Sequence, residues 1–315
     1  MTSSRLFRLD FAAVHFGDDG LDASTVTCAA DTLFSALCIQ ALRAAGYQLL
    51  DELVAAVTSG SLRFTDLLPY ADDVLFAPKP ILRVAGDSGA DASAAKKAAK
   101  RLTFVPVGEL DGFLAGRADL DRLALLQERI GVHGLAERAA IHNGKDDAEP
   151  YRVGFFRFEP TAGLWCLAQG SGSELDLFAG LLENLSALGG ERSSGYGGFS
   201  FTVTDGVPPE LQTVADSNRP LDAQRWLALT TALPTDPELE TALAGATYRL
   251  IRRSGFVASA TYADSPLRKR DIYKFAAGSL FAHRFDGVVA DVGNGVAHPV
   301  HSYAKPLFLP LPEVA

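Results

Sequence analysis

The order of the strand and helix patterns in the first two-thirds of the chain limits its possible folds more than any other feature of the sequence. Apolar and polar residues alternate from Leu6 to Phe11, which predicts a half-buried strand, and the apolar residues after Asp31 recur at helical spacing. With one large insertion set aside, the patterns follow as strand, helix, strand, strand, helix, strand. This is the βαββαβ order of a ferredoxin-like unit, which also underlies RNA-recognition modules, and it predicts an α+β fold.

Seven segments of this part of the chain carry a strand or helix pattern, and the strand at 61–70 is the weakest of them. Asp31 is the expected N-cap of the first helix, and Pro160 and Gly163 mark the turn of an expected hairpin. The second helix is expected to close on Gly189 and Gly190. In chain order the segments are a strand at residues 6–11, a helix at about 32–45, a weaker strand at 61–70, the two hairpin strands within 152–169, a helix at 173–190 and a strand at 198–205.

The rest of the chain divides into an insertion and a second unit. After residue 80 the composition shifts to Ala, Gly, Ser and Lys, which is typical of a loop, and residues 118–130 have the pattern of a helix. A linker rich in Pro, Asp and Ser leads to a strand pattern at 225–233 and a short helix pattern at 237–244. We therefore expect two ferredoxin-like (RRM-like) domains in tandem. The first covers residues 1–210, with an insertion at about 71–150 and a glycine-rich loop at 189–198, and the second, a degenerate copy, covers residues 211–315.

A length of 315 residues and a hydrophobic content of 48% provide enough apolar side chains for two such domains. The first 30 residues lack a basic stretch followed by an apolar one, and no uncharged apolar run reaches the roughly 18 residues that span a bilayer. The sequence thus predicts a cytoplasmic protein without a membrane partner. Cys28, Cys38 and Cys166 form no CxxC pair, so we expect core residues and neither disulfides nor a zinc site.

Charge is unevenly distributed along the chain. The net charge is −9, which argues against a protein that coats nucleic acid nonspecifically. Between residues 249 and 274, however, seven basic residues stand against two acidic ones, and Arg252 and Arg253 are neighbours there. These basic islands in an acidic chain are candidate contacts for an anionic partner. The second island consists of Lys96, Lys97, Lys100 and Arg101.

The segment GGERSSGYGGF, residues 189–199, places five glycines between a helix pattern and a strand pattern. Gly190 and Gly195 have the spacing of a P-loop, but the two residues that follow are not the Lys and Ser or Thr of that motif. A nucleotide-cofactor loop and a nucleophile elbow are thereby excluded, and no cofactor is expected. The segment is suited instead to bring backbone amides close to an extended anionic chain, with Arg192 as a counter-charge. Tyr196 either stacks on a base or packs down as an anchor for the loop.

A ferredoxin-like unit that ends in a loop of the form G-x-R-S-S-G-Y-G-x-F resembles the RAMP superfamily of CRISPR RNA-binding proteins. Further segments, in order along nearly the whole chain, are similar to the Csm-type subunit that holds the 5′ handle of the guide RNA (crRNA) in type III-A effector complexes. Two positions depart from the pattern: Ala30 stands where a serine is usual, and His142 and Asn143 stand where an Asp-Arg pair is common. The matching segments are HFGDDGL at 15–21, DTLFSAL at 31–37, PKP at 78–80, KKAAKR at 96–101 and HPV near 298.

The resemblance implies a non-catalytic subunit that caps one end of a ribonucleoprotein filament in antiviral defence, with no metal and no cofactor. Its implied partners are the crRNA 5′ handle, the large cyclase and nuclease subunit, and the adjacent backbone RAMP subunit. Arg252 and Arg253 join the implied RNA contacts because of the charge of their segment. Carried over position by position, the other contacts would be His15, Gly17, Thr32, Ser35, Lys96, Lys97, Lys100, Arg101, Gly190, Arg192, Ser193, Ser194, Gly195, Tyr196 and Gly197.

Two alternatives from other classes stay open. RAMP endoribonucleases share the glycine loop and often use a histidine to deprotonate a 2′-hydroxyl, so His15 is either their general base or a structural residue at a strand end. A metal hydrolase would need His298 and His301, but Pro299 interrupts their HxxH spacing and no acidic residue is nearby.

Overall fold

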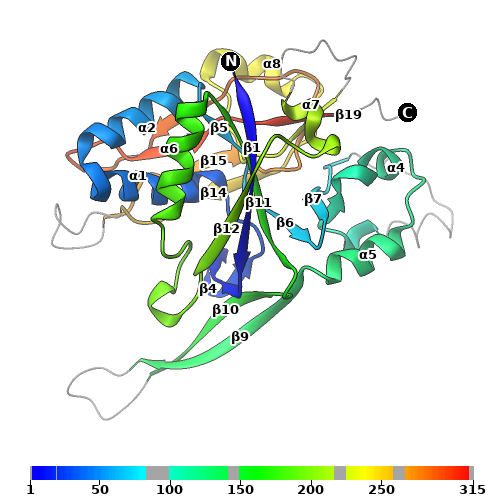
Figure 1. The fold of residues 1–315 in the computed structure, drawn as a ribbon, viewed down its shortest axis with the longest axis horizontal. Coiled ribbons are helices and arrows are strands. Elements are labelled where there is room, and N and C mark those ends of the chain that lie inside the picture. The colour runs from blue at the N-terminus through cyan, green and yellow to red at the C-terminus, as the bar shows by residue number, and fades with distance from the viewer. Residues whose placement is uncertain are drawn as a thin grey trace.

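Seven strands of the first two-thirds of the chain form one central antiparallel sheet in the computed structural model (Figure 1). The structure describes residues 2–18, 20–82, 99–140, 149–215, 225–257 and 267–311. In the sheet, the first expected strand lies between the last one and the second of the two expected hairpin strands. The strand order is β12 (Phe199–Asp205), β1 (Ser3–Phe11), β11 (Ala162–Gly170), β6 (Leu68–Ala71), β7 (Val74–Pro78) and β8 (Phe104–Pro106), and β5 (Arg63–Phe64) also pairs with β11.

Apolar side chains cover both faces of the sheet, which explains why β11 is buried along its whole length. Cys166 packs in the cluster of the helical face, whereas its neighbours Trp165 and Leu167 pack in the cluster of the opposite face, as the alternation of a strand requires. The second half of the chain covers that opposite face together with the helices of the insertion. The helical face is covered by α1 (Ala30–Ala45), α2 (Tyr47–Ser59) and α6 (Gly172–Glu183), which lie to the left of the sheet in Figure 1.

The two helices predicted for the first unit lie where the sequence places them, but their ends differ from the prediction. Gly46, with φ +70°, separates α1 from α2, which the sequence did not predict. A capping box at Ser171 starts α6, which ends at Glu183, well before the expected glycines. The physical reason is tertiary: Leu188 is buried, and its amide donates to the carbonyl of Gly197 at 2.9 Å, so this stretch pairs with the loop instead of continuing the helix.

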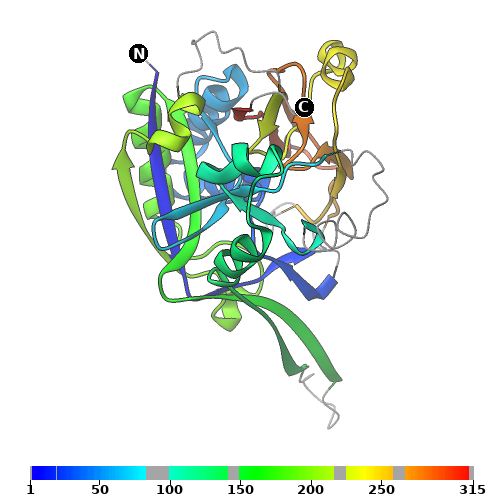
Figure 2. The ribbon, with the colours of Figure 1, turned by 90° about the vertical axis from the view of Figure 1, so that its right-hand side faces the viewer.

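A two-stranded arm projects from the bottom of the sheet (Figures 1 and 2). The hairpin expected around Pro160 is wrong, because β10 (Glu149–Phe158) does not pair with β11. It pairs instead with β9 (Gly131–Ala140) and with β2 (Ala13–Val14). The sequence of β9, GVHGLAERAA, combines residues of low strand propensity without alternation, which is why periodicity missed it. Near the arm lie two short paired strands, β3 (Phe16–Asp18) and β4 (Gly20–Thr25).

The remainder of the insertion is structured as well. Residues 83–98, most of the expected loop, lie outside the described residues, but β7 and β8 extend the central sheet on either side of them. The predicted helix is confirmed as α5 (Leu120–Glu128), with Asp119 as its N-cap. It is preceded by η1 (Val107–Glu109) and α4 (Leu110–Leu114).

The second half of the chain is built from short strands. Among the described residues they form one three-stranded sheet and two ribbons, and no sheet as large as the seven-stranded one of the first half; the boundary near residue 210 stays a prediction. In the described part of the chain no helix has the length and apolarity to cross a membrane. The elements are η3 (Pro209–Leu211), α7 (Gln212–Ala215), α8 (Asp236–Leu243), the sheet of β13 (Arg225–Ala228), β16 (Leu280–Phe281) and β19 (Phe308–Leu311), the ribbon of β14 (Leu250–Arg253) and β15 (Ile272–Phe275), and the ribbon of β17 (Val288–Asp291) and β18 (His301–Ala304).

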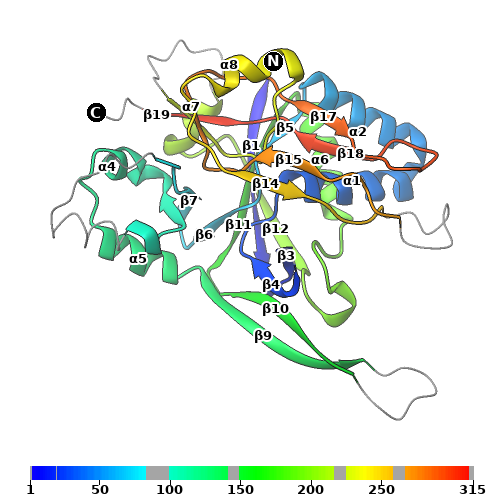
Figure 3. The same cartoon turned by 180° about the vertical axis from the view of Figure 1, so that it is seen from behind.

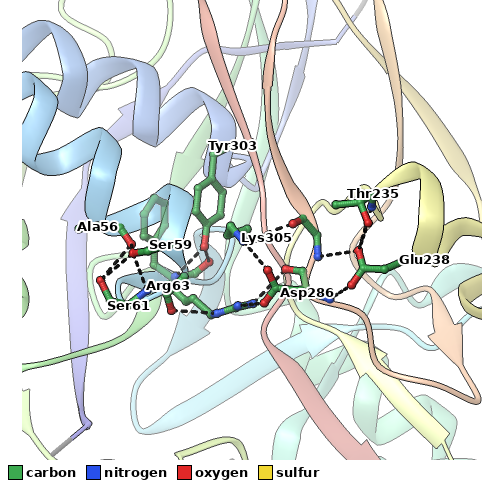
Figure 4. A network of polar contacts seen from close by, with 12 residues as sticks. Ala56, Ser59, Ser61, Arg63, Thr235, Glu238, Asp286, Tyr303 and Lys305 are labelled. Carbon is green, nitrogen blue, oxygen red and sulfur yellow. Dashed lines mark hydrogen bonds and ion pairs between the residues drawn. The ribbon is translucent and has the colours of Figure 1, made fainter.

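Polar contacts join the two halves of the chain (Figure 4). Arg63 of β5 forms an ion pair with Asp286, and Asp286 also accepts from the buried ammonium group of Lys305 at 2.6 Å. The ring of Tyr303 stacks on Phe64 with centroids 4.3 Å apart, although the two residues come from opposite halves. The second half therefore completes the core of the first.

Asp66 joins the halves at a single buried carboxyl. It accepts hydrogen bonds from the amide of Ala30 at 2.8 Å, and from the amide and hydroxyl of Thr231 at 3.0 and 2.7 Å. Burial raises the pKa of Asp66 to about 6, although the hydrogen bonds from Thr231 and Ala30 oppose the shift. Since the unfolded carboxyl ionises near pH 4, the stability that this group contributes is largest below pH 4 and is lost as the pH rises through 6.

We expect Asp66→Asn to be almost neutral at pH 4 and more stable than the wild type above pH 6, by up to about 2–3 kcal/mol. The amide oxygen can accept from both backbone amides, and the amide nitrogen can donate to the Thr231 hydroxyl. Asp66→Ala should instead be destabilised at every pH, because it leaves buried donors unpaired. Urea denaturation of the three proteins between pH 4 and 7 measures both differences. A difference between wild type and Asp66→Asn that does not change with pH would contradict the raised pKa.

Candidate nucleic-acid interface

The glycine-rich loop, residues 189–198, is held against the crossover between β2 and β3. The amide of Gly190 donates to the carbonyl of His15 at 2.9 Å, and the amide of Gly197 donates to the carbonyl of Ala13 at 2.9 Å. Both acceptors belong to the first 15 residues of the chain, far from the loop in sequence. The loop is therefore a positioned surface.

Two glycines of the loop differ in what they require. Gly197 has φ +80°, and a Cβ there would overlap the carbonyl oxygen of Leu188. Gly195 has φ +90°, but a Cβ there would meet no atom within 4 Å. Gly197 thus serves the fold, whereas Gly195 serves only the turn.

Most of the loop amides are already used inside the protein. Besides those of Gly190 and Gly197, the amides of Ser194, Gly195 and Tyr196 donate to carbonyl oxygens within the loop at 3.0–3.4 Å. The interpretation that these five amides are open to an anionic chain is therefore wrong. The loop presents side chains instead: Arg192 and Ser193 are exposed, and Arg192 forms no ion pair with any residue that the structure describes.

Tyr196 packs as an anchor. Its ring stacks on Phe155 of β10 with centroids 5.5 Å apart, and the guanidinium carbon of Arg138 lies 5.7 Å from the centroid of the tyrosine ring. Phe155 lies across Gly134 of β9, where a Cβ would overlap the phenylalanine ring. Of the two interpretations left open for Tyr196, this contact supports the anchor, and it connects the loop to the arm.

Arg138 is a basic residue beside the loop that the sequence did not single out. Its Nε is the one buried side-chain polar atom in the described residues without a hydrogen-bond partner. A buried guanidinium donor that lacks an acceptor is costly, so an acceptor from a bound molecule would stabilise it. No signal in the sequence points to Arg138, because β9 has no recognisable strand pattern. Its place beside the loop is seen only in the structure.

His15 lies between β2 and β3 and is only 6% exposed. Its Nδ1 lies 2.6 Å from the carbonyl oxygen of Gly154. Because a carbonyl only accepts, Nδ1 carries a proton and donates the hydrogen bond to Gly154. Within the described part of the chain, no titratable side chain forms a hydrogen bond or ion pair with His15. Gly17 lies next to it on β3, and a Cβ there would be 3.4 Å from Nε2.

The start of α1 is organised by buried charges. Ala29 is the N-cap, so the prediction of Asp31 as N-cap is wrong; the first amide of the helix, that of Ala30, is satisfied by Asp66. Asp31 is the second residue of the helix, and its side chain is buried. It forms ion pairs with two basic residues of the second half. Arg253 binds it at 2.7 Å and Lys274, which is fully buried, at 2.8 Å.

The electrostatics of this cluster favour the charged form of Asp31. Burial alone would raise its pKa, but the charges of Lys274 and Arg253 outweigh burial and hold the pKa well below its ordinary value. Arg253 also donates to the hydroxyl of Thr32 at 2.8 Å. Arg253 and Thr32 are thus used within the protein, where they position the helix start. Ser35 lies one turn further along α1 and is half-buried.

The structure separates the predicted contacts into groups. His15, Gly17 and the glycine-rich loop meet at β2–β3, and residues 26–29 connect β4 directly to the start of α1. Lys100 and Arg101 are exposed and lead into β8, which contacts α4 and α5. These two helices lie away from the loop in Figures 1 and 3. Lys96 and Lys97 lie outside the described residues.

No three metal-binding side chains come together among the described residues. Nδ1 of His298 lies 3.0 Å from the carbonyl of Pro299, and burial lowers the pKa of His301. This pair accordingly has no further ligands in the described part of the chain.

Comparison with known sequences shows which protein family this chain resembles. A model described as the CRISPR Csm4 C-terminal domain matches residues 221–311. A protein named CRISPR system Cms protein Csm4, from Mycobacterium tuberculosis, is 58% identical over 313 residues, which cover 99% of each chain. The protein of the same name from Streptococcus thermophilus is 33% identical over 316 residues and 98% of each chain.

Solved structures share the fold. One chain of the crystal structure of the Csm3–Csm4 subcomplex in the type III-A CRISPR-Cas interference complex matches with a TM-score of 0.68 and 15% identity, over 98% of this chain and 100% of that one. A chain of the Csm1–Csm4 cassette in complex with cA4 matches with a TM-score of 0.59 and 17% identity, over 98% and 99%. At these identities the likeness concerns the fold alone.

Proposed function

The chain belongs to the Csm4 family of CRISPR proteins, and on this premise we propose that it is a non-catalytic, RNA-binding subunit of a type III-A effector complex in the cytoplasm. In this proposal it grips the crRNA 5′ handle. It also bridges the large cyclase and nuclease subunit to the adjacent backbone subunit in antiviral defence. Structures that match its fold contain Csm3–Csm4 and Csm1–Csm4 pairs, and we propose the same two kinds of partner here. The α+β architecture would then be two ferredoxin-like domains in tandem, the second degenerate.

The observation that carries the proposal is the positioned loop at residues 189–198. Hydrogen bonds to β2 and to the carbonyl of His15 hold it in place, while Arg192 and Ser193 remain exposed on it. Arg138 lies beside the ring of Tyr196 and so places a second cation next to the loop. Its buried Nε has no hydrogen-bond partner among the described residues. Two such guanidinium groups on a fixed backbone suit the phosphates of a single strand. Gly190, Ser194, Gly195 and Gly197 then contribute by shaping the loop.

We expect Arg192→Ala to weaken binding of a repeat-derived single-stranded RNA about tenfold, because it removes a charge-assisted contact to phosphate. The slope of log affinity against log salt should also become shallower by about 0.7, the value for one lost phosphate contact on a single strand. Fluorescence anisotropy at several salt concentrations measures both. Arg117→Ala, which removes an exposed arginine on the α4–α5 side, is the matched control and should change neither. Equal effects of the two substitutions would show that the loop is not the site.

A precursor-processing endoribonuclease is the second candidate, and one observation favours it. Nδ1 of His15 is engaged by the carbonyl of Gly154, so Nε2 is the ring nitrogen left to act as a general base. The same binding experiment decides between the two, because the recovered RNA can be examined on a gel. A single metal-independent cut that His15→Ala abolishes would establish the endoribonuclease. Intact RNA with both proteins would support the binding subunit.

A further inference from the structure

The ribbon of β14 and β15 carries the densest group of exposed aromatic side chains on the described part of the molecule. Tyr248, Phe256 and Tyr273 are exposed there, together with Leu250. Their exposed fractions are 42%, 60%, 58% and 50%. The ribbon continues beyond both strands, because the amide of Val257 donates to the carbonyl of Leu267 at 2.8 Å.

The two faces of the ribbon make different contacts: one packs on the body of the protein, and the other is exposed to solvent. Arg253 and Lys274 point inward to Asp31 at the start of α1. Since successive side chains of a strand alternate, their neighbours Arg252 and Tyr273 point outward, and both are exposed. The inward face thus fixes the ribbon to the body of the protein, which makes the outward face a rigid platform.

Aromatic and arginine side chains are paired on this platform. Arg252 and Tyr273 are direct partners across the two strands. Phe256 and Arg268 are also partners, and the guanidinium carbon of Arg268 lies 5.9 Å from the centroid of the phenylalanine ring. The second pair lies four residues after the first along the β14 side of the ribbon, or roughly 13 Å at the rise of a strand. The platform therefore offers two exposed aromatic rings, each beside a guanidinium group.

The charge of the platform selects the class of ligand. Arg252 and Arg268 are exposed beside the two rings, and Arg249 and Arg270 are exposed elsewhere on the ribbon, against the single carboxylate of Asp271, which lies 3.7 Å from Arg252. A flat ring accepts an unpaired base by stacking, and a neighbouring guanidinium accepts the phosphate of the same strand. The combination fits single-stranded RNA, since a duplex keeps its bases stacked on each other.

We propose that the outward face of the β14–β15 ribbon is a stacking platform for unpaired bases of RNA, with Tyr273 and Phe256 as the stacking residues. This inference rests on the proposed function, because it extends the RNA path from the glycine-rich loop. Figures 2 and 3 place the ribbon on the same side of the molecule as β3 and β4, next to which the loop is held. RNA bound at the loop would thus continue over the ribbon.

The test uses the full-length chain and a single-stranded oligoadenosine RNA that carries one 2-aminopurine. The double variant Tyr273→Leu/Phe256→Leu keeps the apolar bulk and removes both rings. It should bind about tenfold more weakly, with an unchanged salt slope, because stacking and not phosphate contact is lost. Quenching of the 2-aminopurine fluorescence by the protein should also fall. Tyr47→Leu, at a tyrosine of α2 that is 60% exposed, is the matched control and should change neither quantity.

The outcomes separate this inference from the proposed function. If Arg192→Ala weakens binding while the double variant binds and quenches like the wild type, the platform is overturned and the proposed function stands. If the wild type does not bind RNA, alone or in the assembled complex, both fail. If the double variant binds RNA normally but no longer co-purifies with the other subunits, the ribbon is a protein-docking face and the inference is overturned.

Discussion

Asp31→Ala should destabilise the full-length chain by about 3–5 kcal/mol, the usual cost of breaking a buried ion pair by removing one partner. The substitution leaves Lys274, which is fully buried, and Arg253 without their counter-charge at the start of α1. Two cations would then repel each other in a region from which water is excluded. Urea denaturation at pH 7 followed by circular dichroism measures the loss.

Asp271→Ala is the matched control for this prediction. Its carboxylate is also paired with an arginine, Arg252 at 3.7 Å, but both side chains are exposed, so the loss should be below about 1 kcal/mol. A loss for Asp31→Ala as small as that of the control would mean that the cluster does not hold the two halves together. If Asp31→Ala does not fold at all, Asp31→Asn gives a measurable protein, and it should still lose more than the control.

Gly197→Ala should be destabilised by about 2–4 kcal/mol, because the new methyl group combines a left-handed backbone with an overlap on the carbonyl of Leu188. Gly195→Ala shares the positive φ but meets open space, and its loss should be about 1 kcal/mol. Thermal and urea denaturation of the two variants provide the comparison.

The pair also tests what the glycines of the loop are for. From the sequence, Gly195 and Gly197 were equivalent, since both flank Tyr196 and both suited an approach of RNA to bare backbone. The structure predicts unequal losses of stability, with the larger at Gly197. Equal losses would show that the contact with Leu188 does not restrict residue 197.

Local patterns predicted the local structure well. The alternation at residues 6–11 became β1, the apolar spacing at 118–130 became α5, and the strand expected at 198–205 became β12. In each case the pattern is set by burial on one face of the element itself. The glycine-rich loop was also correctly placed between α6 and β12.

Pairing and polar contacts could not be predicted in the same way. β10 follows the pattern of a strand, but its partner β9 carries no pattern, so a hairpin with β11 was the nearest choice. Asp31 looked like a helix cap because its ion-pair partners lie more than 200 residues away in sequence. Arg252 and Arg253 looked like one basic patch. Once they are known to lie on a strand, the alternation of side chains assigns them to opposite faces.

The arrangement of β1 has a consequence for biosynthesis. This strand is made first, but both of its neighbours, β11 and β12, are encoded more than 150 residues later. At about 5–20 residues per second, roughly 10–40 s pass before the ribosome has delivered both of them. During that interval β1 lacks the strands that pair with it in the native sheet, so its backbone edges can pair with other nascent chains. Efficient production of this protein therefore depends on what protects its first strand during translation, and a cell short of chaperones would lose it to aggregation before the native sheet could close.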